Sequence, residues 1–195
     1  MEGSGNTNWE ENVILIDADY ADQMVFELSV QLERMLERRM QKINIAKWVD
    51  YVALDGGLRP GNNRIQVLLI YSGEKTILQN FEPSDLKDML NGHAFTDHLG
   101  EFCFASFPVE QEIVTRGKLY TQSAEMLLSS EKVKRLILVP DMNEYGIDLK
   151  RVLSDIGKTE TTLLTVNPLA GMSCGQEVLT YSLMAALGVK GSELG

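Results

Sequence analysis

Short runs of apolar residues alternate along the chain with stretches in which apolar residues recur every three or four positions. Strands are predicted at residues 13–16, 65–71 and 135–139. The first and the third are short apolar runs, which are typical of central strands covered on both faces. The other stretches have the spacing of amphipathic helices. Helices are predicted at residues 20–42, 45–54, 83–90, 116–128, 149–156 and 173–187.

Three further strands complete the expected fold. Residues 76–78 are predicted to pair with residues 65–71 as a hairpin, because Ser72-Gly73-Glu74-Lys75 has the composition of a tight turn. Residues 102–107 and 162–166 are the other two strands. Strands that alternate with helices in this way predict a Rossmann-like three-layer α/β/α fold, with a mainly parallel sheet and one antiparallel hairpin.

Composition and charge limit the classes of function. The 195 residues include 44% hydrophobic and 24% charged residues, which is ordinary for one globular domain. We expect a flexible N-terminal arm at residues 1–12 and a single α/β domain at residues 13–195. The net charge of −10 disfavours nucleic acid as a partner. Arg38 and Lys42 share one helix face, but glutamates are interleaved with them, which favours a solvated surface.

Cysteine usage and hydropathy predict a cytoplasmic protein. Cys103 and Cys174 lie far apart without a CxxC pair, which fits a reducing compartment. The first twelve residues do not have the pattern of a signal peptide. The longest apolar-rich stretch, at residues 178–189, is too short to span a bilayer, so no membrane partner is expected.

Carboxylates follow two of the predicted central strands. Asp17 and Asp19 come after the first apolar run, and Asp141 and Glu144 come after the third. Ligands of open α/β sheets bind outside the carboxyl ends of the strands, so these four side chains converge if the two strands are neighbours. Four carboxylates repel one another unless a cation neutralises them, and oxygen ligands suit Mg²⁺ or Mn²⁺. The alternative interpretation is that Asp19 and Asp141 only cap the helices that follow them.

This arrangement resembles the NYN branch of the PIN-like nucleases. In that branch a strand near the N-terminus ends in Asp, and a later strand ends in an Asp-x-Asp motif followed by an aromatic residue. The matching stretch here is Asp141-Met142-Asn143-Glu144-Tyr145, which is one residue longer. The resemblance implies metal-dependent phosphodiester cleavage with Asp17, Asp141 and Glu144 as catalytic metal ligands. It also allows an inactive relative, because Tyr20 stands where the branch usually has Asn.

A second resemblance is to the haloacid-dehalogenase phosphatases. Asp17-Ala18-Asp19 has their Asp-x-Asp form, in which the first Asp is the nucleophile and the second is the general acid. Ser72 would stand for their hydroxyl residue, although the predicted turn accounts for it equally well. An Asp-x-Asp motif alone has low specificity.

The loop at residues 167–175 predicts a different kind of site. Ser173 and Gln176 have the spacing of a capping box, so a helix is expected to begin there. Free backbone N–H groups at such a helix start, around Ser173 and Gly175, suit a phosphate or a carboxylate. The alternative is a plain connection that binds nothing.

His93 and His98 are the two histidines of the chain. A zinc site would need further ligands, and Cys103 is the one thiol near them in sequence, so surface or packing roles are the alternative. Three functions therefore remain open. They are a metal-dependent phosphoryl or phosphodiester hydrolase, a non-catalytic protein-interaction domain that could form a homodimer, and a binder of a small anionic ligand or nucleotide.

Overall fold

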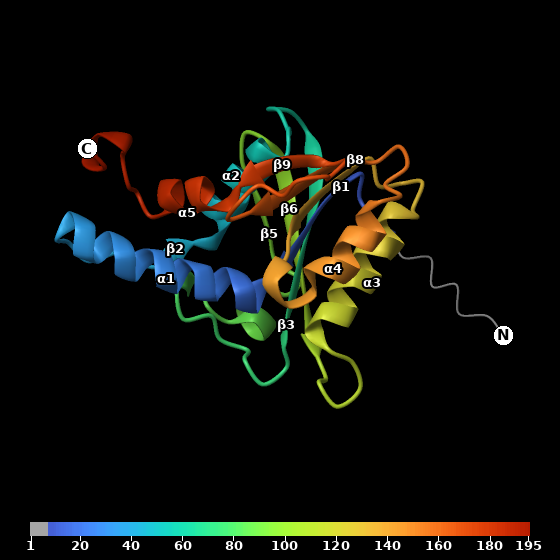
Figure 1. The fold of residues 1–195 in the computed structure, drawn as a ribbon, viewed down its shortest axis with the longest axis horizontal. Coiled ribbons are helices and arrows are strands. Elements are labelled where there is room, and N and C mark those ends of the chain that lie inside the picture. Colours follow the sequence, from blue (N-terminus) through green and yellow to red (C-terminus); the bar gives the residue numbers. More distant parts are fainter. Residues whose placement is uncertain (1–7) are drawn as a thin grey trace.

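A computed structural model of the chain describes residues 8–195. Seven strands form one sheet in the order β5-β6-β3-β1-β7-β8-β9 (Figure 1). All neighbouring strands in it are parallel except β5 and β6. If the short edge strand β5 is set aside, the order by position in the chain is the 3-2-1-4-5-6 of a doubly wound sheet. The strands are β1 (Asn12–Asp17), β3 (Asn63–Ser72), β5 (Ala94–Thr96), β6 (Gly100–Val109), β7 (Arg135–Val139), β8 (Glu160–Thr165) and β9 (Gly175–Val178).

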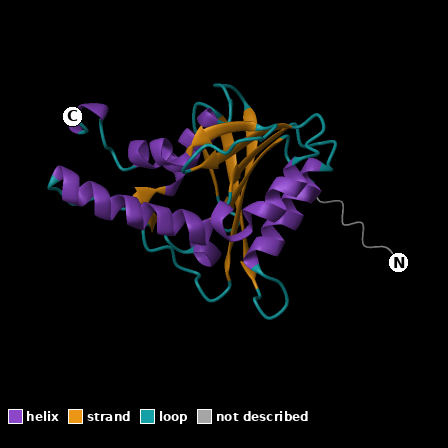
Figure 2. Cartoon of the chain, in the orientation of Figure 1, coloured by secondary structure: helices purple, strands orange, loops and turns teal. Residues whose placement is uncertain are grey.

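Helices cover both faces of this sheet (Figures 1 and 2). The helices α1 (Ala18–Leu36), α2 (Ile45–Asp55) and α5 (Leu179–Ala186) pack on one face, and α3 (Arg116–Leu128) and α4 (Met142–Leu153) pack on the other. The predicted Rossmann-like three-layer fold is therefore confirmed. The smaller elements are β2 (Ile43–Asn44), which pairs with β4 (Phe81–Glu82), the single π turn η1 (Leu86–Leu90) and the 3-10 turn η2 (Gly191–Glu193).

The central strand β1 contributes to both hydrophobic cores. Ile14 and Ile16 point into the core beneath α1, α2 and α5, whereas Val13 and Leu15 point into the core beneath α3 and α4. This division follows from the alternation of side chains along a strand. All four side chains are fully buried, so the polar residues that follow Ile16 are held at a rigid strand end.

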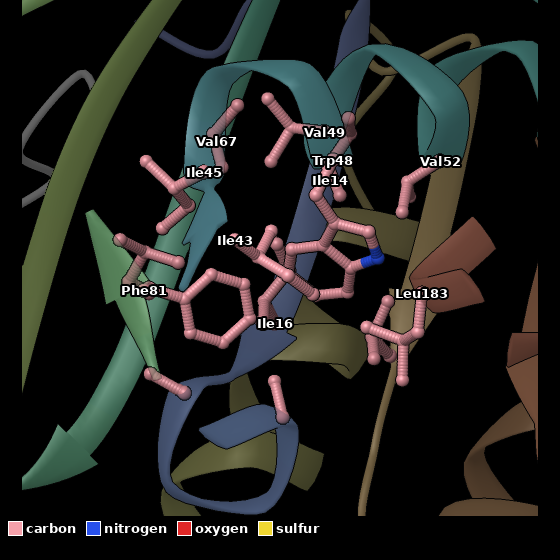
Figure 3. Close-up of a cluster of buried hydrophobic side chains, with 14 of the residues drawn as sticks. Ile14, Ile16, Ile43, Ile45, Trp48, Val49, Val52, Val67, Phe81 and Leu183 are labelled. Carbon is pink, nitrogen blue, oxygen red and sulfur yellow. The ribbon is translucent and has the colours of Figure 1, made fainter. Parts of the chain in front are cut away.

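Trp48 lies at the centre of the first core (Figure 3). Its ring centroid is 5.2 Å from that of Phe81, and the two rings are tilted by 45°. The indole Nε1 donates a hydrogen bond of 3.1 Å to Oγ of Ser182 on α5. This bond satisfies the polar end of a buried tryptophan and connects two helices of the same layer.

The predicted hairpin between residues 65–71 and 76–78 is wrong. Both edges of β3 are occupied by parallel neighbours, β1 and β6. The turn at Ser72 does form, with a hydrogen bond of 2.7 Å from Lys75 N–H to the Ser72 carbonyl, but the chain then leaves the sheet. Ile77 makes an isolated bridge with Asp85. The antiparallel pair of the sheet is β5 with β6.

Two predicted helices differ in extent from the observed ones. The helix expected at residues 20–42 ends at Leu36, because Glu37 adopts a left-handed conformation with φ of 53°. The Glu33 carboxylate then accepts the Met40 N–H at 2.8 Å and fixes the chain as it leaves the helix. The helix expected at residues 83–90 is the single turn η1, which is capped by the Asp85 side chain.

The predicted helix start at Ser173 is also wrong. Residues Gly175–Val178 form the edge strand β9, and α5 begins only at Leu179. The Gln176 side chain, expected in a capping box, instead bonds both backbone groups of Leu169, at 2.7 Å and 2.8 Å.

The first residues of the predicted N-terminal arm, 1–7, lie outside the described part of the chain. Trp9 is partly buried and packs against the second core, and β1 begins at Asn12, one residue before the predicted domain boundary.

Candidate functional site

The carboxyl ends of β1 and β7 lie side by side, because these strands are parallel neighbours at the centre of the sheet. Asp17 is the last residue of β1, and Asp141 follows β7 by two positions. Asp19 lies in the first turn of α1, and Glu144 lies in the first turn of α4. The structure thus brings together all four carboxylates that the sequence suggested, at the point where the strand order reverses.

A guanidinium group occupies the centre of these carboxylates. Arg116, the first residue of α3, has its Nη1 3.1 Å from Asp19 Oδ2 and its Nη2 3.5 Å from Asp141 Oδ2. Nη2 also pairs with the Glu144 carboxylate. Nε lies 2.9 Å from Asp17 Oδ2, but its N–H is not aligned for a hydrogen bond with any described residue. One cation, from the start of α3, therefore faces four carboxylates from two other segments of the chain.

The two aspartates that follow β1 have different partners from those expected. Asp17, rather than Asp19, caps α1, since its Oδ1 accepts the Tyr20 N–H at 3.0 Å. Asp19 Oδ2 instead accepts two hydrogen bonds from Ser72, one from N–H at 3.0 Å and one from the hydroxyl at 2.5 Å. The prediction that Asp19 caps the helix is therefore wrong. Asp141 does cap α4, because its Oδ1 accepts the N–H groups of Asn143 and Glu144. Capping is not its only contact, since its Oδ2 also faces Arg116.

Tyr145 joins the two strand ends directly. Its hydroxyl donates to Asp17 Oδ2 at 2.8 Å and accepts the Asp141 N–H at 2.9 Å. Its backbone lies outside the helical region within α4, with φ of −131° and ψ of 22°. The ring stacks in a tilted arrangement on Tyr120, with centroids 5.2 Å apart. The hydroxyl is thus held by packing as well as by hydrogen bonds.

Burial dominates the electrostatics of Asp17. Its side chain is inaccessible to solvent, and this burial raises the pKa of Asp17 from 3.8 to about 6. The positive charge of Arg116 and the hydrogen bonds from Tyr20 and Tyr145 act in the opposite direction, and Asp19 adds a smaller upward effect. Burial alone would lower the pKa of Arg116, but the charges of Asp17, Glu144 and Asp19 raise it overall. The guanidinium is therefore charged and held by the carboxylates.

The spacing of the carboxylates reflects the guanidinium between them. Three carboxylates that shared one ion directly would have oxygens close to one another. Among residues 8–195, the one group of three acidic, histidine or cysteine side chains whose ligand atoms all lie within 4.8 Å of one another is Asp50, Asp97 and His98. The carboxylates around Arg116 are more widely spaced. A cation that binds directly to them would require Arg116 to leave the centre.

A pocket opens beside this cluster, with a volume of about 610 Å³. Arg116 and Asp19 belong both to the cluster and to the lining of the pocket, and Lys75 contributes a second positive charge to the pocket. Phe26 also lines the pocket, and 56% of its surface is exposed. Asp22 lines the pocket as well, so its two cations are matched by two carboxylates, Asp19 and Asp22. A cavity of this size, with a polar lining and an exposed aromatic ring, has room for a small organic ligand.

Arg116 was not identified from the sequence as a site residue, although one signal was present. It is the first residue of a helix, where the helix dipole disfavours a positive charge. An arginine in that position indicates an acidic partner outside the helix. Its partners could not be named, because they depend on where α3 lies over the sheet.

Ser173 and Gly175 lie far along the chain from these carboxylates and take part in different contacts. Ser173 Oγ donates to the Leu153 carbonyl at 3.4 Å, and Gly175 begins the edge strand β9. The helix N-terminus on which the anion-binding prediction depended is therefore not at these residues.

The fold and the cluster define a doubly wound α/β protein with a carboxylate–arginine centre at its strand switch point. The chain belongs to a family of unknown function, DUF6621, whose model matches residues 6–194. Neither a curated protein nor a solved structure matches the chain. Across residues 8–195, every helix is too short or too polar to cross a membrane.

Proposed function

We propose that the protein is a Mg²⁺- or Mn²⁺-dependent phosphoryl or phosphodiester hydrolase. The observation that carries this proposal is the charge imbalance at the strand ends, where one guanidinium faces four carboxylates. A surplus of buried and half-buried negative charge favours a further cation, and carboxylate oxygens are the ligands that Mg²⁺ and Mn²⁺ prefer. The site residues proposed to hold the ion are Asp17, Asp19, Asp141 and Glu144.

Arg116 has two roles in this proposal. Without the ion, it neutralises part of the carboxylate charge. With an ion held by the carboxylates, the guanidinium would be free to turn toward the neighbouring pocket, where it could pair with two oxygens of a phosphate in a bidentate manner. Lys75 provides the second positive charge for the same phosphate, and Phe26 offers a flat face to an attached ring.

In this proposal the ion supplies the chemistry of hydrolysis, and neighbouring side chains keep its carboxylate ligands in place. A divalent cation in such a site activates water and stabilises the negative charge on the phosphate. Tyr145 and the Tyr20 N–H hold both oxygens of Asp17, so this carboxylate keeps its orientation when Arg116 moves. Ser72 orients Asp19 in the same way.

A second candidate is a non-catalytic domain in which the cluster is only structural. The observation that favours it is that Arg116 already contacts all four carboxylates. In that case the guanidinium ties α3 to α1 and α4 permanently, and the protein works through contacts with other proteins or with a second copy.

Calorimetric titration of EDTA-treated protein with MnCl₂ and MgCl₂ separates these functions. We expect saturable binding by the wild type, loss of binding in Asp17→Asn, and tighter binding in Arg116→Met, where the competing guanidinium is absent. Arg151→Met removes an exposed arginine of α4 that pairs with Asp148, and should bind Mn²⁺ as the wild type does. If neither the wild type nor Arg116→Met binds either ion, the cluster is structural.

Hydrolysis of p-nitrophenyl phosphate and its bis-ester tests the catalytic part of the proposal. We expect Mn²⁺-dependent release of nitrophenol by the wild type and by Arg151→Met. Arg116→Met should retain Mn²⁺ but lose hydrolysis, because the phosphate then lacks its guanidinium partner. Equal hydrolysis by Arg116→Met and the wild type would exclude this role for Arg116.

A further inference from the structure

A second group of metal-ligating side chains lies at the opposite end of the sheet. Asp50 is on α2, and Asp97 and His98 form the turn between β5 and β6. One ligand atom from each lies within 4.8 Å of the others. The turn precedes Gly100, which pairs with Asn63 at the amino ends of β6 and β3. The carboxylate–arginine centre lies at the carboxyl ends of the strands, so the two groups are separate.

One oxygen of the Asp50 carboxylate has no hydrogen-bond partner among the described residues. Its Oδ1 is buried and accepts no hydrogen bond from the described residues, although 17% of the side chain as a whole is exposed. His98 Nδ1 is 3.9 Å away, which is too far for a hydrogen bond. A buried acceptor of this kind is costly unless a cation or donor occupies the gap.

The backbone holds the turn in position for such a cation. Asp97 N–H donates to the Gly100 carbonyl at 3.0 Å, and Asp97 Oδ1 accepts the Leu99 N–H at 2.8 Å. The His98 carbonyl accepts the Gly61 N–H at 3.2 Å. These bonds involve one oxygen of the Asp97 carboxylate and no atom of the His98 ring.

We propose that Asp50, Asp97 and His98 form a Zn²⁺ site whose fourth coordination position is open to solvent. Imidazole and carboxylate together suit Zn²⁺, whereas Mg²⁺ prefers oxygen ligands alone. Ligands about 2.0–2.2 Å from a tetrahedral Zn²⁺ are roughly 3.4 Å from one another. The 3.9 Å between His98 and Asp50 closes to that separation by a small rotation of the exposed imidazole. Three protein ligands and one open position are the arrangement of zinc sites that bind water or a substrate.

Calorimetric titration of EDTA-treated protein with ZnCl₂ tests this site. We expect the wild type to bind one equivalent at this site, in addition to any Zn²⁺ that the carboxylate–arginine centre takes up. Loss of a residue that only hydrogen-bonds a metal ligand weakens metal binding by up to about 100-fold. His98→Gln and Asp97→Asn remove a ligand itself, so each should weaken Zn²⁺ binding by more than that. Asp97→Asn keeps the oxygen that accepts the Leu99 N–H, so the turn should persist. Far-ultraviolet circular dichroism of both variants should match that of the wild type.

Three control variants make the outcome specific. His93→Gln removes an exposed histidine just before β5 and should bind Zn²⁺ as the wild type does. Asp17→Asn should keep the Zn²⁺ equivalent of this site even where it removes Zn²⁺ from the carboxylate–arginine centre, so failure here is distinct from failure at that centre. The proposal is overturned if the wild type shows no saturable binding, if His98→Gln binds equally well, or if Cys103→Ser removes the binding instead.

Discussion

The ring of Tyr145 packs directly against the backbone of Gly117, and no side chain fits between them. A Cβ atom at position 117 would lie 2.7 Å from Cδ1 and 2.8 Å from Cβ of Tyr145. Gly117 follows Arg116 on α3, so the helix that carries the guanidinium packs closely against Tyr145, the residue of α4 whose hydroxyl reaches Asp17. The two residues couple the position of α3 to the orientation of the buried carboxylate.

Replacement of this glycine should therefore disturb the centre without changing its charges. We expect Gly117→Ala to displace the Tyr145 ring and to lower the free energy of unfolding by about 1–3 kcal/mol, as overpacking in cores does. Urea denaturation measures the loss. Gly146→Ala is the matched control, because its new methyl group would meet mainly the flexible end of Met142, at 3.2 Å. Equal effects of the two substitutions would mean that the Tyr145 contact carries no special constraint.

Arg116 should be among the residues most important for stability in the absence of a metal ion. Its side chain is 17% exposed, and its removal leaves four carboxylates without their common partner. We expect Arg116→Met to lower the free energy of unfolding by about 3–5 kcal/mol at neutral pH in EDTA, the usual loss when one member of a buried ion pair is removed. Mn²⁺ should restore part of this loss if the ion replaces the guanidinium.

The loss of unfolding free energy in Arg116→Met is compared with the losses in two other variants. Arg116→Lys keeps the charge but cannot reach all four carboxylates at once, so its loss should be intermediate. Arg151→Met breaks an exposed ion pair with Asp148 and should cost at most about 1 kcal/mol. A loss for Arg116→Met no greater than that of Arg151→Met would show that the cluster does not hold the helices together.

The buried carboxyl of Asp17 should make stability depend on pH. Because burial raises the pKa of Asp17 to about 6, the folded state binds more protons at this group than the unfolded state between about pH 4 and pH 6. Its contribution is therefore fully present below pH 4 and is lost as the pH rises through 6. The shift corresponds to a free energy on the order of 3 kcal/mol.

Asp17→Asn removes this titration and keeps an oxygen for the Tyr20 N–H. We expect the difference in unfolding free energy between variant and wild type to move in favour of the variant as the pH rises from 4 to 7. The measurement is urea denaturation across this range in EDTA. A difference that stays constant, or that moves in favour of the wild type, would contradict the raised pKa.

The meeting of the four carboxylates could be predicted because it depends on features that short stretches of sequence reveal. An unbroken apolar run marks each central strand, and the carboxyl ends of parallel neighbours lie at one edge of the sheet. Asp17 follows one such run directly, and Asp141 follows another after Pro140. Their partner Arg116 could not be paired with them, because it comes from a helix whose position over the sheet is set by packing against β1, β3 and α4.

The errors in the fold have the same physical origin. The turn at Ser72 has real turn chemistry, but local composition does not show that both edges of β3 are already occupied by β1 and β6. The edge strand Gly175–Val178 is short and half polar, so it lacks the alternation that marks a strand. Its neighbour β8 provides the hydrogen bonds that make it a strand. Asp50 and His98 likewise meet only through the packing of α2 beside the β5–β6 turn.

The hydrogen bond between Trp48 and Ser182 should contribute measurably to stability. Ser182→Ala leaves the indole N–H without its acceptor in an apolar core, which costs about 1–3 kcal/mol. Ser154→Ala is the matched control, since both hydroxyls donate to the carbonyl three residues earlier but Ser154 is exposed. In a Trp48→Phe background the loss from Ser182→Ala should shrink, because no N–H remains to be satisfied. Urea denaturation of the four proteins in this cycle measures the coupling, and a coupling energy near zero would show that the bond adds nothing to the packing of α2 against α5.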